Sequence, residues 1–507
     1  MSNNNLQMTP LSLEEICLQK VAFLLRSGYW RKYHVNPFTF LPSTVLDELT
    51  SKLLSDKANP IQCCLESAPL QPLLTSSRLQ HLDLSYFPYV EHFCMFLNLL
   101  SVGCQNLQSL SLPENFSIND SEQLELLLLS CHKLEYLHSP TFFNLDALKN
   151  CANLKCLRFH FPARFLVDYF CHEGVGSLQY LQSLKVFALC GYYDFSCDYK
   201  AIAVILKCCP KIISVGYIDS IMAIQCIQNL QHQRNMPPIQ FQLRKCFWGF
   251  DSYSRVCYFL AKVGFITPDF PYLIKMAVTF CPYIEELVFT IPRNDSIKYL
   301  SGLKNLTFLY IDFGVCDDNY LSEFVSLLCE IGPQLKHLGV VRSNIIPINI
   351  AIENCPNLTS LKYFPEEKIN QEILSSVSTS CLKNLTLDNC DKFSLLYALS
   401  CCKNLKELFI FDGRCLDDNL LNTILDKNPL SELKVVYILK CRLSRKGLRN
   451  FLISAKQLDT FFIFSDELEL CNKDALLQEL NRVNTCKSGR KLLKTEIFNR
   501  KLNPCCF

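Results

Sequence analysis

The sequence predicts an α/β solenoid, in which short parallel strands form a curved sheet with helices on its outer side. The pattern L-x-x-L-x-L recurs along most of the chain, and its first apolar position usually returns after 20 to 30 residues. Apolar segments of helical length lie between the copies, as in Ser121 to Cys131. Because one such unit cannot bury its own apolar face, neighbouring units are expected to stack around one continuous core.

The repeat is clearest at its first apolar position, which is nearly always leucine. The alternating residues that follow are typical of a short strand with every second side chain pointing inward. Several copies begin with a cysteine, a small side chain suited to the buried turn between helix and strand. This spacing is typical of leucine-rich repeats. The first positions are Leu79, Leu107, Leu134, Leu154, Leu184, Ile212, Ile284, Leu306, Leu335, Leu358, Leu382, Leu405, Leu433 and Leu458.

Three segments follow from the extent of the repeat. Residues 1–75 do not follow it and form a small helical N-terminal segment, residues 76–465 form the solenoid, and residues 466–507 form a C-terminal cap with a basic tail. Within the solenoid the register is poor over residues 218–280. There we expect an irregular insertion, with one strand marked by Ile239, Phe241 and Leu243 and a helical stretch around Tyr253–Phe280.

Composition excludes several classes of function. A formal net charge of +2 over 507 residues offers no basic surface for nucleic acid or for an anionic membrane. No stretch reaches the roughly 18 apolar residues of a membrane span. The N-terminus is polar and acidic before any apolar run, which is unlike a signal peptide. We therefore expect reduced thiols and a location in the cytoplasm, with the nucleus as the alternative.

The 30 cysteines raise the question of zinc, but their spacing does not favour it. Zinc sites normally use paired C-x-x-C knuckles or a cysteine pair followed by a histidine pair. The cysteine doublets lack that spacing, and the nine histidines are scattered. No nucleophile-elbow, P-loop, dinucleotide-binding or H-E-x-x-H motif is present. We therefore expect no metal, no cofactor and no enzymatic activity.

Two short helices are predicted in the N-terminal segment. The first begins at Ser12, which suits the N-cap of a capping box that Glu15 completes. On it, Leu13, Cys17, Val21 and Leu24 fall within about 80° of one another, a narrow stripe suited to a groove on another protein. The second helix begins around Leu41 and Pro42, and places Val45, Leu49 and Leu53 on one stripe.

Ser12-Leu13-x-x-x-Cys17-x-x-x-Val21 resembles the BC-box, the elongin C-binding element of the von Hippel–Lindau-box family. Leu41-Pro42-x-x-Val45 resembles the cullin box that follows it in that family. Partners in the cullin 5 branch usually carry a further proline where this chain has Thr44, so the resemblance favours cullin 2. It implies that Leu13, Cys17 and Val21 contact elongin C, and that Leu41, Pro42 and Val45 contact the cullin.

The cysteine-led repeats, over about residues 75–465, resemble those of ubiquitin-ligase substrate receptors. The order of box and repeats is similar to that of the zyg-type receptors of cullin 2 ligases, although the armadillo repeats of those receptors are absent. The resemblance implies a substrate-recognition subunit without chemistry of its own. Its partners would be elongin C, elongin B, cullin 2 with its RING subunit, and a protein client that the sequence does not name.

Other interpretations of the same residues remain open. The N-terminal helices could instead cap the first repeat, since solenoids need their ends covered. Leu41-Pro42-x-x-Val45-Leu46 also resembles the start of an F-box, which would recruit a cullin 1 ligase, although the following residues contain two prolines and no tryptophan. A repeat scaffold unrelated to ubiquitin is the third reading.

Aromatic residues occupy the outward strand positions of the later repeats, where the early repeats carry Asp83, Ser111 and Arg158. Exposed aromatic stripes often mark interfaces, so we expect the client to bind here. The alternatives are that the C-terminal tail covers these rings or that they belong to the core. The candidate client-binding residues are Tyr310, Phe364, Phe409, Phe411, Tyr437, Phe462 and Phe464.

Overall fold

The structure, a computed structural model, describes residues 12–55, 70–85, 93–103, 105–113, 121–141, 143–159, 180–189, 199–248, 272–291, 296–313, 320–342, 346–365 and 381–465. The chain divides into two compact units, Met1–Cys246 and Phe247–Phe507, and each is described by itself.

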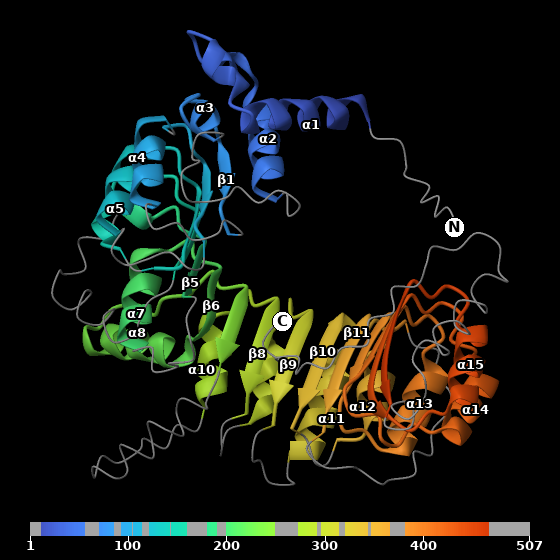
Figure 1. The fold of residues 1–507 in the computed structure, drawn as a ribbon. Helices are drawn as coiled ribbons and strands as arrows, with labels where there is room; N and C mark the ends of the chain where they lie inside the picture. Colours follow the sequence, from blue (N-terminus) through green and yellow to red (C-terminus); the bar gives the residue numbers. More distant parts are fainter. Residues whose placement is uncertain are drawn as a thin grey trace, which may run out of the picture. The chain divides into compact units, whose positions relative to one another are not determined.

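The first unit begins with the helical segment and continues into parallel strands. The segment consists of α1 (Leu13–Arg26), η1 (Tyr29–Lys32), η2 (Pro37–Phe40), α2 (Ser43–Ser55) and α3 (Gln71–Leu74). The strands are β1 (His81–Asp83), β2 (Ser109–Ser111), β3 (Tyr136–Ser139), β4 (Cys156–Phe159), β5 (Val186–Leu189) and β6 (Ser214–Asp219), paired in chain order. Between them lie α4 (Phe93–Gly103), α5 (Ser121–Ser130), η4 (Leu145–Leu148), α7 (Tyr199–Cys208) and α8 (Ile221–Gln233), on one side of the strands (Figure 1).

The second unit repeats the same arrangement more regularly. Its strands β8 (Glu286–Thr290), β9 (Phe308–Asp312), β10 (His337–Val341), β11 (Ser360–Phe364), β12 (Asn384–Leu387), β13 (Glu407–Ile410), β14 (Val435–Cys441) and β15 (Thr460–Ser465) pair in parallel in chain order. The other elements are α10 (Leu273–Phe280), η6 (Ile297–Gly302), α11 (Tyr320–Ile331), η7 (Gly332–Gln334), α12 (Ile348–Asn354), α13 (Lys392–Cys401), α14 (Asp418–Lys427) and α15 (Arg445–Ser454).

The core of the second unit is a ladder of apolar side chains, one from each strand. These residues pair directly across the sheet, and none exposes more than 2% of its surface. Stacking of this kind buries the apolar face that a single repeat would leave in water. It confirms the predicted α/β leucine-rich-repeat solenoid. The ladder consists of Leu287, Leu309, Leu338, Leu361, Leu385, Leu408, Val436 and Phe461.

The strand expected at Ile239–Leu243 lies elsewhere. Strand β7 runs from Lys245 to Trp248, and the residues just before it have no regular structure. Leu243 is the first apolar position of this repeat, while Cys246 and Trp248 replace the two inward leucines and are buried. The prediction was wrong because a cysteine and a tryptophan broke the leucine pattern. Residues 249–271, in the expected helical insertion, lie outside the described residues.

Candidate functional site

The candidate adaptor-binding site is α1, whose start is fixed by the predicted capping box. The Glu15 backbone N–H donates to Ser12 Oγ at 3.1 Å, and the Ser12 N–H donates to a carboxylate oxygen of Glu15 at 2.8 Å. At the other end, Gly28 adopts φ +69°, a left-handed conformation that glycine accepts without strain. The chain can therefore turn sharply from α1 into η1.

The two faces of α1 differ in burial. Leu18, Ala22 and Leu25 are buried, and α1 contacts η1 and α2. On the opposite face Leu13 is 78% exposed, Cys17 is exposed, and Val21 and Leu24 are half-buried. The stripe predicted to contact elongin C is therefore not sealed beneath the chain's own repeats. Because the helix is held by its other face, the box residues are free to contact a partner.

Two apolar residues widen this stripe beyond the prediction. Ile16 is 50% exposed and Phe23 is 61% exposed, and both lie next to Leu13 around the helix. With Val21 at the other edge, the arc spans about 160° at 3.6 residues per turn, and the exposed Lys20 is the one charged residue within it. The motif consensus contains neither position, so motif matching missed them. The signal that could have found them is a helical wheel of the whole segment.

The candidate cullin-binding residues lie at the start of α2. Pro42 is exposed, and Leu41 and Val45 are half-buried. Of the predicted stripe, Leu49 and Leu53 are buried. The helix also contacts β1, where the Asp47 carboxylate accepts hydrogen bonds of 3.0 Å from the backbone of Gln80 and His81. α2 therefore covers the edge of the first strand, while Pro42 at its N-terminal end stays exposed.

The face of the second unit that points away from the buried ladder carries the aromatic residues. Tyr310, Phe409, Tyr437 and Phe462 share one row across the strands, with Gly339, Lys362 and Thr386 between Tyr310 and Phe409. The Tyr310 ring lies over Gly339, where an added Cβ would come within 2.2 Å of Cδ2. In the next row, Phe364 and Phe411 meet edge to face at 6.3 Å.

These rings are less exposed than the sequence suggested. Phe409 and Tyr437 stack at 5.1 Å, and Tyr437 and Phe462 stack at 5.6 Å between centroids. Phe462 is only 8% exposed, whereas the rest of the described set is half-buried. In-register aromatic residues on parallel strands cover one another, which reduces the exposure of each ring. The side chain of Phe464 lies outside the described residues.

Ionisable groups on this face are partly removed from water. Burial raises the pKa of Tyr310 and, on the next row, that of Asp388, while it lowers the pKa of Lys362. Asp312 pairs with Arg342 through two hydrogen bonds of 2.6 and 2.7 Å. In the first unit the corresponding row contains Asp83, Ser111, His138 and Arg158, with no phenylalanine, tyrosine or tryptophan over β1 to β4. The two units thus present different chemistry on this face.

Most cysteines that precede a strand are buried, as their position predicted. Burial raises the pKa of Cys131 to about 11 and that of Cys355 to about 12. The Cys151 thiol, whose pKa is raised to about 12, donates to the Cys131 carbonyl at 3.3 Å. Such thiols stay protonated at neutral pH and are not nucleophiles. Cys381 is an exception, because it is exposed.

These buried thiols predict a loss of stability in alkali. In the unfolded chain a thiol ionises near pH 9.0, whereas folded Cys151 and Cys355 hold their protons to about pH 12. The contribution of these thiols to the free energy of unfolding should therefore be constant below about pH 9 and fall as the pH rises from about 9 towards 12. Urea unfolding across this range measures it. Replacing Cys151 and Cys355 with alanine should reduce the slope, and an unchanged slope would contradict this origin.

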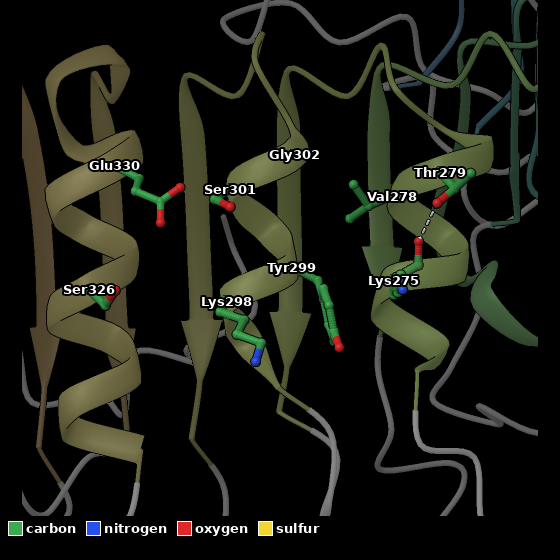
Figure 2. Close-up of a pocket in the computed structure, with 9 residues that line it drawn as sticks. All are labelled: Lys275, Val278, Thr279, Lys298, Tyr299, Ser301, Gly302, Ser326 and Glu330. Atoms are coloured by element: carbon green, nitrogen blue, oxygen red, sulfur yellow. Dashed lines mark hydrogen bonds between the residues drawn. The ribbon is translucent and has the colours of Figure 1, made fainter.

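A shallow groove of about 450 Å³ lies among helices of the second unit. Figure 2 shows its lining residues on three neighbouring elements, α10, η6 and α11. Gly302 allows a close approach, since a Cβ there would lie 2.6 Å from Val278 Cγ1. On α10 the Thr279 hydroxyl donates to the Lys275 backbone carbonyl at 2.7 Å. The lining residues are Lys275, Val278, Thr279, Lys298, Tyr299, Ser301, Gly302, Ser326 and Glu330.

Among the residues that the structure describes, no cluster of three or more histidine, cysteine, aspartate or glutamate side chains is arranged to hold a metal ion. None of the described helices has the length and apolar character needed to cross a membrane.

Solved structures resemble this chain, whereas no known family or curated protein does. No protein-family model matches the sequence, and no curated protein matches it. The chain resembles an internalin of Listeria monocytogenes at 13% identity and a TM-score of 0.33, over 74% of this chain and 83% of that one. It also resembles a chain from the crystal structure of the yeast Rad7 and Elc1 complex, at 15% identity and a TM-score of 0.36. The match covers 94% of this chain and 91% of that one.

A third resemblance is to the leucine-rich-repeat protein LegL7 of Legionella pneumophila, at 12% identity and a TM-score of 0.32, over 68% of this chain and 97% of that one. Likenesses at these scores carry no functional conclusion.

Proposed function

We propose that this protein is a substrate-recognition subunit of an elongin BC–cullin 2 ubiquitin ligase. The observation that carries the proposal is the exposure of Leu13 and Cys17 on a helix whose opposite face is buried. Leu13 is not isolated, because Ile16 and Phe23 beside it are also exposed, and a contiguous exposed apolar patch commonly marks a binding site. The BC-box resemblance names the partner that this surface fits, elongin C.

The proposed binding sites follow one another along the chain. Leu13, Cys17 and Val21 contact elongin C, which brings elongin B, and Leu41, Pro42 and Val45 select cullin 2 with its RING subunit. The aromatic rows of the second unit hold the protein client. The protein performs no chemistry and acts by proximity, because holding a client beside a charged ubiquitin-conjugating enzyme replaces a bimolecular encounter with a local one.

Affinity purification of the full chain from cells tests the proposal. We expect elongin B, elongin C and cullin 2 to co-purify in comparable amounts, and purified elongin BC to bind the purified chain directly. Recovery of cullin 1 with an F-box adaptor would instead assign the N-terminal segment to the F-box class. Recovery of neither set would leave a repeat scaffold outside the ubiquitin system and would overturn the proposal.

A further inference from the structure

A row of lysines lies at the N-terminal ends of strands in the second unit. Lys383, Lys406 and Lys434 directly precede β12, β13 and β14. The Lys406 N–H donates to the Lys383 carbonyl at 2.7 Å, and the Lys434 N–H donates to the Lys406 carbonyl at 2.8 Å, so the three are in register. Lys336, before β10, continues the row with Thr359 between. All four lysines are exposed, and we call them the lysine edge.

The lysine edge concentrates positive charge. Neighbouring strands lie about 4.8 Å apart, so lysines on adjacent strands start from that separation. Within the part of the chain that the structure describes, none of these four side chains forms an ion pair. Like charges directly opposite on neighbouring strands repel and destabilise a sheet. Because a bound anionic group would relieve this repulsion, the lysine edge favours an acidic partner.

The lysine edge lies beside the row that contains Phe409, which we call the aromatic row. Leu405 and Leu408 are buried, and Lys406 between them is exposed. Phe409 follows Leu408 and is half-buried on the side away from the buried ladder. The next repeat has the same arrangement. A repeat of this kind therefore presents a cation and an aromatic ring about 10 Å apart along its strand.

Carboxylates limit the positive stretch at both ends. Glu285 and Glu286 lie two strands before the lysine edge, and Asp459 lies one strand after it. Glu407 lies between the lysine edge and the aromatic row. From β10 to β14 the positive stretch measures about 19 Å, which an extended chain of about six residues would span. Further carboxylates lie at or just beyond the opposite ends of the strands, namely Asp312, Asp388 and Asp412.

We propose that the lysine edge and the aromatic row together bind an extended client segment in which acidic residues alternate with aromatic or other apolar residues. This inference rests on the proposed function, which places the client on the aromatic rows. In an extended chain successive side chains point to opposite sides. A segment lying across the strands would therefore turn its carboxylates towards the lysine edge and its apolar side chains towards the aromatic row.

Two other anionic partners fit this face less well. A nucleic acid strand that followed the lysine edge would meet carboxylates at both ends after about 19 Å, and phosphates are repelled by carboxylates. A membrane surface is bound by apolar side chains that protrude into it. The rings of the aromatic row instead stack on one another, with centroids 5.1 and 5.6 Å apart. A protein segment is therefore the occupant that both rows favour.

Fluorescence anisotropy of the full chain with a labelled peptide of about eight residues, in which glutamate and tyrosine alternate, tests the inference. We expect saturable binding that weakens as salt is added, because part of the attraction is ionic. A peptide with glutamine in place of glutamate, and one with serine in place of tyrosine, should each bind at least about tenfold more weakly. The double variant Lys406→Glu with Lys434→Glu should weaken binding of the glutamate–tyrosine peptide by at least about tenfold at about 0.1 M salt.

The matched control is the double variant Lys427→Glu with Lys446→Glu. These lysines are exposed and lie on the helices α14 and α15, so the net charge changes equally while the sheet face is unaltered. Peptide binding by the control should equal that of the wild type. Thermal unfolding and elongin BC binding should be unchanged in both double variants, which shows that each is folded.

The outcomes separate this inference from the proposed function. Expected peptide binding by a chain that does not bind elongin C would overturn the proposed function and support the peptide surface. Elongin C binding without peptide binding, or with equal affinity for either substituted peptide, would overturn the inference alone. A single-stranded RNA oligonucleotide and vesicles of phosphatidylcholine and phosphatidylserine are the remaining probes. Binding of either one that the Lys406 and Lys434 reversal abolishes, without peptide binding, would assign the lysine edge to that ligand instead.

Discussion

Leu13→Asp is expected to weaken elongin C binding at least a hundredfold while leaving the fold intact. Burying a leucine in a partner's pocket contributes about 1.5–3 kcal/mol, and a carboxylate in its place would be desolvated without a partner. Each 1.4 kcal/mol corresponds to about a tenfold change in affinity. The fold should tolerate the change because Leu13 is 78% exposed and lies in the first turn, where an acidic residue interacts favourably with the helix dipole.

Isothermal titration of purified elongin BC into the chain measures this effect, and thermal unfolding checks the fold. Gln19→Asp is the matched control, since it adds the same charge to an exposed position of α1 outside the apolar arc. It should bind elongin C as the wild type does. Equal affinity of the Leu13 variant and the wild type would show that the exposed stripe is not the elongin contact.

The second large effect is expected at the aromatic row of the second unit. Replacing Phe409 and Tyr437 with alanine should abolish client capture, because it removes a ring pair stacked at 5.1 Å from the centre of the aromatic row. Interface energy is usually concentrated in such central aromatic residues. Both rings are half-buried, so stability is also lost, and the ring pair accounts for about 0.5–1.5 kcal/mol beyond the apolar area that each ring buries.

Proximity labelling in cells with the proteasome inhibited measures client capture, with elongin C labelling as the internal reference. The proteins labelled by the wild type should be lost from the double variant, while elongin C labelling persists. Arg158→Ala, an exposed residue of the corresponding row in the first unit, is the control and should retain the clients. Unchanged client labelling by the double variant would place client binding elsewhere.

The sequence alone determined the repeat and the start of α1, for a clear physical reason. Both depend on short-range patterns: alternating apolar residues that must all face one core, and a serine and a glutamate three positions apart that satisfy each other's backbone. The same reasoning failed at β7, where Trp248 fills an inward position as well as a leucine does. Packing accepts any apolar side chain that fits, whereas a motif search accepts only the expected one.

Only the tertiary structure decided which apolar side chains reach solvent. The helix pattern alone does not tell that Leu18 and Leu25 face α2 and η1 while Leu13, Ile16 and Phe23 are left in water. Nor does strand alternation reveal that Phe462 is covered by its neighbour Tyr437. Exposure depends on what packs against a residue from distant parts of the chain. A local pattern therefore predicts a face, and the packed neighbours decide whether a partner can reach it.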